Sequence, residues 1–246
     1  VVTASTGNHG AACSLAMSLL GIDGKIVVPT IVHKNKVNNI LNFGGKVEYH
    51  GDDCLSAEER AQEISKTTDA TYISPYNDPA IICGQGTMGY EIDQDLKNID
   101  SVFVSVGGGG LISGVGGYLK SVQKNIKMVA VSPKNSCVMY ESIKAEKQLD
   151  LPSDPTLSDG TAGGVEMGSI TFELCQRIVD EFILVTEDEI ADGIRIGVEK
   201  HHQLIEGAAG AAIAGFMKQK DKLNGQRVVI VMCGGNISSE VLKSIL

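Results

Sequence analysis

Short runs rich in β-branched residues alternate along the chain with longer segments of helical periodicity, and this alternation restricts the fold more than any other feature. The predicted strands are Val1–Ala4, Lys25–Pro29, Lys46–His50, Thr71–Ser74, Ser101–Ser105, Lys127–Val131, Phe182–Val185 and Arg227–Met232. Amphipathic stretches lie between them, such as Ala11–Leu20, Leu55–Lys66 and Ala80–Leu96. This order is typical of βαβ units, whose crossovers place helices on both faces of a parallel sheet. We therefore expect an α/β fold with two doubly wound, mostly parallel open sheets.

Prolines and turn-forming residues divide these elements into two groups. The segment Tyr72–Pro79 carries two prolines and predicts a small α/β domain of residues 1–77 followed by a large α/β domain of residues 78–246. The chain opens on Val1–Ala4, a run typical of a buried strand, so we expect an upstream segment that supplies the N-terminal part of the larger domain. The irregular segment Asp150–Ser169 is longer than most connections and is predicted to be functional or mobile.

Composition restricts the partners. The 246 residues carry 30 acidic and 21 basic side chains, a net charge of −9, so we expect neither nucleic acid nor an anionic membrane as a partner, because both require a basic surface. The most apolar stretch, Leu204–Met217, is interrupted by Glu206 and is shorter than the roughly 18 residues of a membrane span. The 6 cysteines form no C-x-x-C pair, which favours buried thiols in a reducing, cytoplasmic compartment over a zinc or dithiol site.

Three loops follow predicted strands, at the edge where open α/β sheets bind ligands. The first runs from Ser5 through Thr6, Gly7 and Asn8 to His9 and leads into a helix. Its hydroxyls, amide and backbone N–H groups could bind a carboxylate or a phosphate. The residues alone leave a second interpretation open, in which Ser5 or Thr6 caps the helix and Gly7 turns the chain.

The other two loops are rich in glycine. Residues 107–111 read Gly-Gly-Gly-Gly-Leu, and because four glycines cost backbone entropy, we expect their amides to wrap a phosphate rather than form a packing turn. No G-x-G-x-x-G follows the opening strand and no Lys-Ser/Thr follows the glycines, which disfavours a nicotinamide site and excludes a Walker loop. The third loop is Cys233-Gly234-Gly235-Asn236, whose thiol either faces the same edge or is simply buried.

In this order the three loops resemble those of fold type II pyridoxal-phosphate enzymes, in the threonine/serine dehydratase and serine racemase branch. STGNH is similar to that family's Ser-x-Gly-Asn-His substrate loop, GGGGL to its tetraglycine phosphate loop and CGGN to its Ser/Cys-Gly-Gly-Asn contact with the pyridine ring. Weaker similarities are Gly84–Thr87, Ser158–Gly160, Thr186–Glu189 and Glu206–Gly210. The resemblance covers essentially the whole chain and implies pyridoxal 5'-phosphate as the cofactor.

The resemblance also implies roles for individual residues. Those that would bind the cofactor are Asn8 at its 3-hydroxyl, Gly107, Gly108, Gly109, Gly110 and Leu111 at its phosphate, and Cys233 at its pyridine nitrogen. Those that would bind the substrate are Ser5, Thr6, Gly7, His9 and Asp159, although Asp159 could equally serve a turn. The candidate catalytic residues are Thr6, where serine racemases carry an acid/base serine, and Glu206, because an unpaired carboxylate on an apolar helical stretch should face the site or a partner.

Two departures from the family pattern affect the expected chemistry. The family attaches its cofactor to a lysine in a Ser-x-Lys-x-Arg-Gly motif ahead of the substrate loop; this chain has no such motif, and Lys34 and Lys36 follow the wrong strand. We expect that lysine in the upstream segment, with a non-catalytic relic as the alternative. Residues 132–138 contain no Asp or Glu, so we expect no divalent metal there.

The resulting hypothesis is an ammonia-lyase that converts L-threonine, L-serine or a related 3-hydroxy amino acid into a 2-oxo acid and ammonia by β-elimination. A neutral Cys233 thiol would make the cofactor a weak electron sink, which favours prompt loss of a β-leaving group. Racemisation is the alternative within the same fold, disfavoured by the methyl group and stiff χ1 of Thr6. An alternative of another class is a non-catalytic module that binds the cofactor or an amino acid. The resemblance further implies a homodimer.

Overall fold

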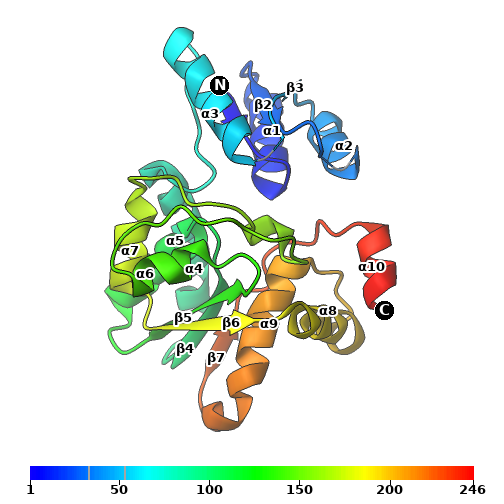
Figure 1. Ribbon diagram of the computed structural model, residues 1–246. Helices are drawn as coiled ribbons and strands as arrows, with labels where there is room; N and C mark the ends of the chain where they lie inside the picture. Colours follow the sequence, from blue (N-terminus) through cyan, green and yellow to red (C-terminus); the bar gives the residue numbers. More distant parts are fainter. Residues whose placement is uncertain (33, 53) are drawn as a thin grey trace. The chain divides into compact units, whose positions relative to one another are not determined.

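The structure is a computed structural model that describes residues 1–32, 34–52 and 54–246, without the side chains of residues 34 and 35. Contacts between Cα atoms divide the chain into two compact units, Val1–Asp78 and Pro79–Leu246. Figure 1 labels most of the helices and strands of each unit. The predicted boundary, between residues 77 and 78, lies next to this division. We describe each unit by itself.

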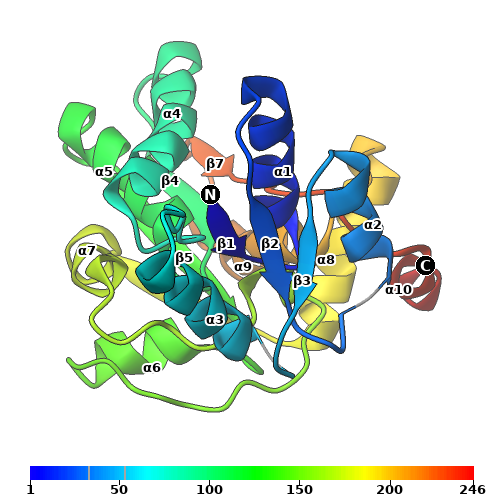
Figure 2. The same cartoon turned by 90° about the horizontal axis from the view of Figure 1, so that it is seen from above.

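The smaller unit is built on a parallel three-stranded sheet, whose strands lie side by side in Figure 2. Its elements are β1 (Val2–Ala4), α1 (Asn8–Leu20), β2 (Lys25–Val28), α2 (Lys34–Asn42), β3 (Val47–Tyr49) and α3 (Cys54–Thr67). Side chains alternate across β2, so that Ile26 packs with residues of α1 and α2 while Val27 packs with α3. Helices therefore cover both faces of the sheet, as the doubly wound pattern predicts.

The predicted strand Thr71–Ser74 is only a parallel bridge between Tyr72 and Val2. Two backbone hydrogen bonds form the bridge, from Val2 N–H to Thr71 and from Ile73 N–H to Val2. The carbonyl of Ile73 then accepts a hydrogen bond from the Thr3 hydroxyl at 2.6 Å. A side chain of β1 thus occupies the acceptor with which a longer strand would continue pairing.

The larger unit contains a parallel sheet of order β6-β5-β4-β7. Its strands are β4 (Ser101–Ser105), β5 (Lys127–Pro133), β6 (Glu181–Val185) and β7 (Val228–Ile230). Its helices are α4 (Pro79–Asp95), α5 (Gly110–Val122), α6 (Val138–Lys144), α7 (Ile170–Ile178), α8 (Glu187–His201), α9 (Gly207–Gln219) and α10 (Ser239–Ile245), with short 3₁₀ turns at Asp159–Thr161 (η1) and Lys220–Leu223 (η2). All residues of β4 are buried. Its neighbours are β5 and β7, so the loop that follows β4 leaves the sheet at an interior position.

Two apolar clusters cover the faces of this second sheet. Val102 and Val104 of β4 belong to a cluster with α5, whereas Phe103 points to the opposite face and belongs to a cluster with α8 and α9. The alternation again follows the two-residue period of a strand. The prediction of an α/β fold with doubly wound parallel sheets is therefore confirmed in both units.

The segment Asp150–Ser169, predicted to be functional or mobile, is held by side chains of residues that precede it in the chain. Gln148 donates from Nε2 to Ser169 Oγ at 2.9 Å and to the Glu166 carbonyl at 3.2 Å, and its Oε1 accepts from Gly168 N–H at 2.6 Å. Asn135 Nδ2 donates to the Pro155 carbonyl at 2.8 Å. These bonds fix a stretch that has little regular structure apart from η1.

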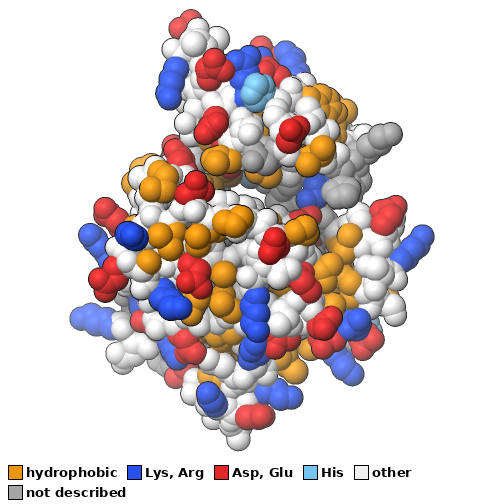
Figure 3. Space-filling view, in the orientation of Figure 1, with side chains coloured by type: hydrophobic (Ala, Val, Ile, Leu, Met, Phe, Trp, Pro, Cys, Tyr) orange, Lys and Arg blue, Asp and Glu red, His pale blue; other side chains and the backbone are white. Residues whose placement is uncertain are grey.

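The surface charge, the helix lengths and the placement of possible metal ligands can be compared with the partners expected from the sequence. On the face drawn in Figure 3, acidic and basic side chains are interspersed, and basic side chains do not gather into one continuous patch. Among the helices that the structure describes, none is long and apolar enough to cross a bilayer. Among the described residues, no three His, Cys, Asp or Glu side chains are placed so that they could hold a metal ion together.

Candidate functional site

The glycine loop after β4 presents backbone donors. Gly109, at φ +84°, is the N-cap of α5, and the helix begins at Gly110. In the part of the chain that the structure describes, the N–H groups of residues 107–111 have no acceptor in the protein. The first N–H groups of a helix are unpaired and carry its positive dipole end, so this loop can bind an anion with backbone atoms alone.

Neighbouring elements pack closely against this loop at Gly107 and Gly109. A Cβ atom built on Gly107 would lie 2.6 Å from the Thr161 carbonyl oxygen, in η1. A Cβ on Gly109 would lie 2.8 Å from Cys175 Sγ, in α7, and 3.1 Å from Met139 Cε, in α6. These contacts define the shape of the loop, and no pattern in the sequence marks Thr161, Cys175 or Met139 as the residues that make them.

Cys233 follows β7 and lies beside the end of β4. Its Sγ is 3.3 Å from the Oγ of Ser105, the last residue of β4. Burial raises the pKa of the Cys233 thiol, and the negative charge of Glu206 raises it further. The group is therefore a neutral thiol at neutral pH. Ser105 is a partner that the sequence analysis missed, although it ends the strand that leads into the glycine loop.

Glu206 lies before a helix rather than on one, which corrects the predicted placement: it is the N-cap of α9. Its carboxylate is buried and accepts a hydrogen bond from Asn236 N–H at 2.8 Å, and its own N–H donates to the Gly234 carbonyl at 3.2 Å. Gly234 has φ +92°, and a Cβ there would overlap the Glu206 carboxyl group. Through these contacts with Gly234 and Asn236, Glu206 holds the loop that carries Cys233 in place.

Asp159 immediately precedes Gly160, which lies close to Glu206. Asp159 is the first residue of η1 and is exposed. A Cβ built on its neighbour Gly160 would be 3.1 Å from Glu206 Oε1. The structure therefore places η1, the glycine loop and the Cys233 loop together in the larger unit.

The Ser5–Asn8 loop of the smaller unit combines backbone and side-chain groups. Ser5 Oγ accepts a hydrogen bond from Gly7 N–H at 3.2 Å, and Gly7 is the N-cap of α1 with φ −112°. Ser5 and Thr6 are partly exposed, and Asn8 is exposed. Ser5 therefore makes the turn that one interpretation predicted, and its backbone still leads directly into the N-terminus of a helix.

His9, in the first turn of α1, is the most perturbed titratable group of this loop. Its Nε2 lies 3.0 Å from Thr3 Oγ1 and 3.4 Å from Cys13 Sγ. Burial lowers the pKa of His9 from 6.5 to about 4, so the imidazole is neutral at physiological pH. Burial also raises the pKa of the Cys13 thiol to about 11.

The lysines considered in the sequence analysis lie in α2, away from these loops in the sequence. His33, just before them, is outside the described residues, as is the side chain of Lys34. Lys36 is half-buried. Neither of the two lysines lies on a loop that follows a strand of this unit's sheet.

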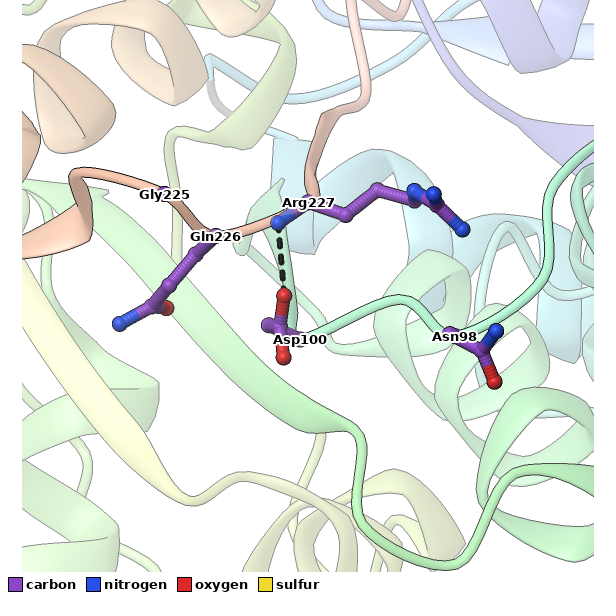
Figure 4. A pocket seen from close by; sticks show the side chains of 5 residues that line it. All are labelled: Asn98, Asp100, Gly225, Gln226 and Arg227. Atoms are coloured by element: carbon purple, nitrogen blue, oxygen red, sulfur yellow. Dashed lines mark hydrogen bonds between the residues drawn. The ribbon is translucent and has the colours of Figure 1, made fainter.

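A surface hollow on the larger unit lies elsewhere. It is lined by Asn98, Asp100, Gly225, Gln226 and Arg227, and Figure 4 shows the hydrogen bond from the Arg227 backbone to the Asp100 carboxylate. These residues precede β4 and β7. The hollow is therefore at the amino edge of the sheet, opposite the glycine loop, and is not part of the candidate site.

Comparison with known proteins gives relatives over the whole chain. The family profile described as "Pyridoxal-phosphate dependent enzyme" matches residues 1–234. The chain is 38% identical over 246 residues to an L-threonine ammonia-lyase of Thermotoga maritima and 35% identical over 239 residues to a catabolic L-threonine dehydratase of Escherichia coli K12. These alignments include 100% and 96% of this chain, which spans 61% and 72% of the lengths of the two relatives.

Solved structures of similar proteins give the same relatives. The chain is similar to the processed form of threonine deaminase isoform 2 from Solanum lycopersicum, with a TM-score of 0.93 at 34% identity, over 100% of this chain and 72% of that one. It is also similar to maize serine racemase, with a TM-score of 0.91 at 31% identity, over 99% of this chain and 75% of that one. Both the dehydratase and the racemase likenesses expected from the sequence are present.

Proposed function

The chain belongs to the family of pyridoxal-phosphate-dependent enzymes, and on that premise we propose that the protein is a cytoplasmic, homodimeric ammonia-lyase acting on L-threonine, L-serine or a related 3-hydroxy amino acid. The substrate would lose its β-hydroxyl as water, and hydrolysis would then release ammonia and a 2-oxo acid. Similarity to a threonine ammonia-lyase and a threonine dehydratase supports the reaction. The single observation that carries the proposal is the glycine loop, with its unpaired N–H groups, in the order of motifs that the family shares.

The residues of the glycine loop fit the cofactor's phosphate. A phosphate oxygen needs several converging donors and no side chain in its way. The N–H groups of Gly107, Gly108, Gly109, Gly110 and Leu111 offer such donors at the start of α5. The packing of Thr161 and Cys175 against the loop fixes those donors before any ligand binds.

Cys233 would set the electronic character of the cofactor. When bound, the cofactor's pyridine ring takes up electron density from the amino acid's Cα. A neutral thiol beside the ring nitrogen stabilises a positive charge there less than a carboxylate would. Cys233 is held neutral by burial and by the charge of Glu206, which favours rapid departure of a β-hydroxyl over a long-lived carbanion.

The smaller unit would bind the amino acid. We assign the backbone N–H groups of Ser5, Thr6, Gly7 and His9 to the substrate carboxylate, which requires Gly7 N–H to give up its hydrogen bond to Ser5 Oγ when the carboxylate binds. We assign the Asn8 amide to the cofactor's 3-hydroxyl. The Thr6 hydroxyl is the candidate acid/base, and Asp159 would help to place the substrate. The catalytic role predicted for Glu206 stays a prediction, because its contacts with Gly234 and Asn236 favour a positioning role.

Racemisation is the second candidate function, favoured by the likeness to maize serine racemase. Thr6 keeps the hydroxyl that such chemistry requires, but its branched side chain is stiffer than serine. The two functions differ in product, since a racemase forms the D-amino acid faster than the 2-oxo acid. A non-catalytic module would bind the cofactor and form neither product.

The test uses the complete protein with added pyridoxal phosphate. The 2-oxo acid is measured from L-threonine and L-serine, and chiral chromatography measures the D-amino acids. Borohydride reduction followed by mass spectrometry of the intact chain and its peptides locates any lysine adduct. We expect 2-oxo acid and an adduct on a lysine ahead of the substrate loop. The absence of 2-oxo acid from every 3-hydroxy amino acid tested would reject the ammonia-lyase.

A further inference from the structure

A hydrogen bond between two side chains joins the two ends of the substrate loop. Thr3 is in the middle of β1 and fully buried, and His9 is the second residue of α1. Their side chains meet at 3.0 Å, between Thr3 Oγ1 and His9 Nε2. The residues between them form the end of the strand and the loop itself, so this bond closes the loop at its base.

The proton on this bond can be assigned from the hydrogen bonds of Thr3. A threonine hydroxyl has one proton, and Thr3 donates it to the Ile73 carbonyl at 2.6 Å. Oγ1 can therefore only accept in its contact with His9. The imidazole must then carry its proton on Nε2, which also faces Cys13 Sγ at 3.4 Å.

The surroundings of His9 contain no charged partner among its described contacts. Those contacts are the Thr3 hydroxyl, the Cys13 thiol and the Ile73 carbonyl. The thiol is neutral because burial raises its pKa. No carboxylate is in this set. The Ile73 carbonyl raises the pKa of His9, but burial lowers that pKa by more, so the neutral imidazole is favoured.

We propose that His9 is a positioning residue for substrate binding. Its neutral Nε2–H donates a hydrogen bond to Thr3 Oγ1, which we call the clasp, and so holds the N–H groups of residues 5–9 in one arrangement. A carboxylate then meets donors that are already ordered, and binding does not have to order them. The inference rests on the proposed function for the identity of the ligand. The clasp itself is a property of the smaller unit.

Two amide substitutions distinguish loss of the hydrogen bond to Thr3 from loss of the imidazole ring as such. His9→Gln carries an amide that reaches the position of Nε2, whereas the shorter His9→Asn does not. Thr3→Val removes the acceptor at nearly constant volume. Thr68→Val is the matched control, because its hydroxyl also donates to a backbone carbonyl, that of Ile64 at 2.7 Å, after α3 in the same unit.

The readouts are KM and kcat for L-threonine in the complete protein with pyridoxal phosphate. We expect His9→Asn and Thr3→Val to raise KM about tenfold or more while kcat changes less than about threefold. His9→Gln should recover most of the lost affinity. The double variant Thr3→Val/His9→Asn should be no worse than the weaker-binding single variant, because both remove one interaction.

Several results would overturn the proposal. They are an unchanged KM in His9→Asn and Thr3→Val, additive effects in the double variant, a loss as large in Thr68→Val, and a failure of His9→Gln to recover affinity. Nitrogen-15 NMR of the His9 ring tests the clasp without any turnover, and a neutral ring protonated on Nδ1 would also refute it. A wild-type protein that makes no 2-oxo acid rejects the proposed reaction instead, and the NMR result then still decides the clasp.

Discussion

The two loops assigned to ligand binding are held in place by different means. The glycine loop of the larger unit has no side chains at residues 107–110, and its shape comes from the close approach of Thr161 and Cys175. The Ser5–Asn8 loop of the smaller unit is held by polar side chains, with Ser5 bonded to Gly7 and His9 bonded to Thr3. Both loops connect the carboxyl end of a parallel strand to the start of a helix.

This difference determines which changes each loop tolerates. A loop fixed by van der Waals contact is sensitive to any added atom and insensitive to pH. A loop fixed by a neutral imidazole tolerates added atoms better but depends on protonation and on single hydrogen-bonding partners. Three further experiments test this contrast, beginning with the largest expected effect.

Gly109→Ala should damage the glycine loop most. Its φ of +84° is strained for alanine, and the added Cβ would lie 2.8 Å from Cys175 Sγ. We expect a loss of roughly 3 kcal/mol of unfolding free energy and about a hundredfold weaker binding of pyridoxal phosphate, measured by denaturation and by absorbance titration. Gly117→Ala in α5 is the control, because its Cβ meets nothing closer than Ile178 Cδ1 at 3.8 Å. Equal cofactor affinity in the two variants would contradict the steric account.

The smaller unit should lose stability as the solution becomes acidic. The pKa of His9 falls from 6.5 in the unfolded chain to about 4 in the folded one, so between these values the unfolded chain binds a proton that the folded chain excludes. The contribution of the neutral His9 ring to the free energy of unfolding is complete above pH 6.5. It declines as the pH falls towards 4, by roughly 3 kcal/mol in all. Urea denaturation at several pH values measures it. His9→Gln should lack this component, and an identical pH slope in that variant would refute the assignment.

Glu206→Gln tests an intermediate case, in which a side chain and a tightly packed glycine hold the Cys233 loop together. The neutral amide loses part of the charge-assisted bond with Asn236 N–H. We expect a loss of roughly 1–2 kcal/mol of unfolding free energy. The exposed Glu240→Gln should stay within about 0.5 kcal/mol of wild type. If the two variants unfold alike, Glu206 does not fasten the loop.

The fold was predictable because its signals are local. Alternating runs of β-branched and amphipathic residues located the strands, and their order identified parallel sheets. The failure at Thr71–Ser74 comes from a tertiary contact, since the Thr3 hydroxyl takes the Ile73 carbonyl. Glu206 was placed on a helix because its apolar surroundings in the sequence do not reveal where the helix begins.

For the candidate site, only the backbone motifs can be recognised in the sequence. Runs such as GGGGL show where a loop lacks side chains, because each glycine is visible in the sequence. The residues that shape the loop, Thr161 and Cys175, are distant along the chain, and no local pattern marks them. Thr3 was likewise invisible as a partner of His9, since a buried threonine in a strand is unremarkable by residue type.

The three hydrogen bonds of Gln148 divide the long segment before α7 into parts that differ in how they exchange with solvent. One amide side chain bonds to Glu166, Gly168 and Ser169 at once, so we expect this end of the segment to open in a single cooperative event instead of fraying residue by residue. The rate of hydrogen–deuterium exchange at the Gly168 amide reports that event directly. Ser169 precedes α7, which carries Cys175 behind the glycine loop, and we therefore expect the same opening to loosen the packing that supports the N–H groups of that loop.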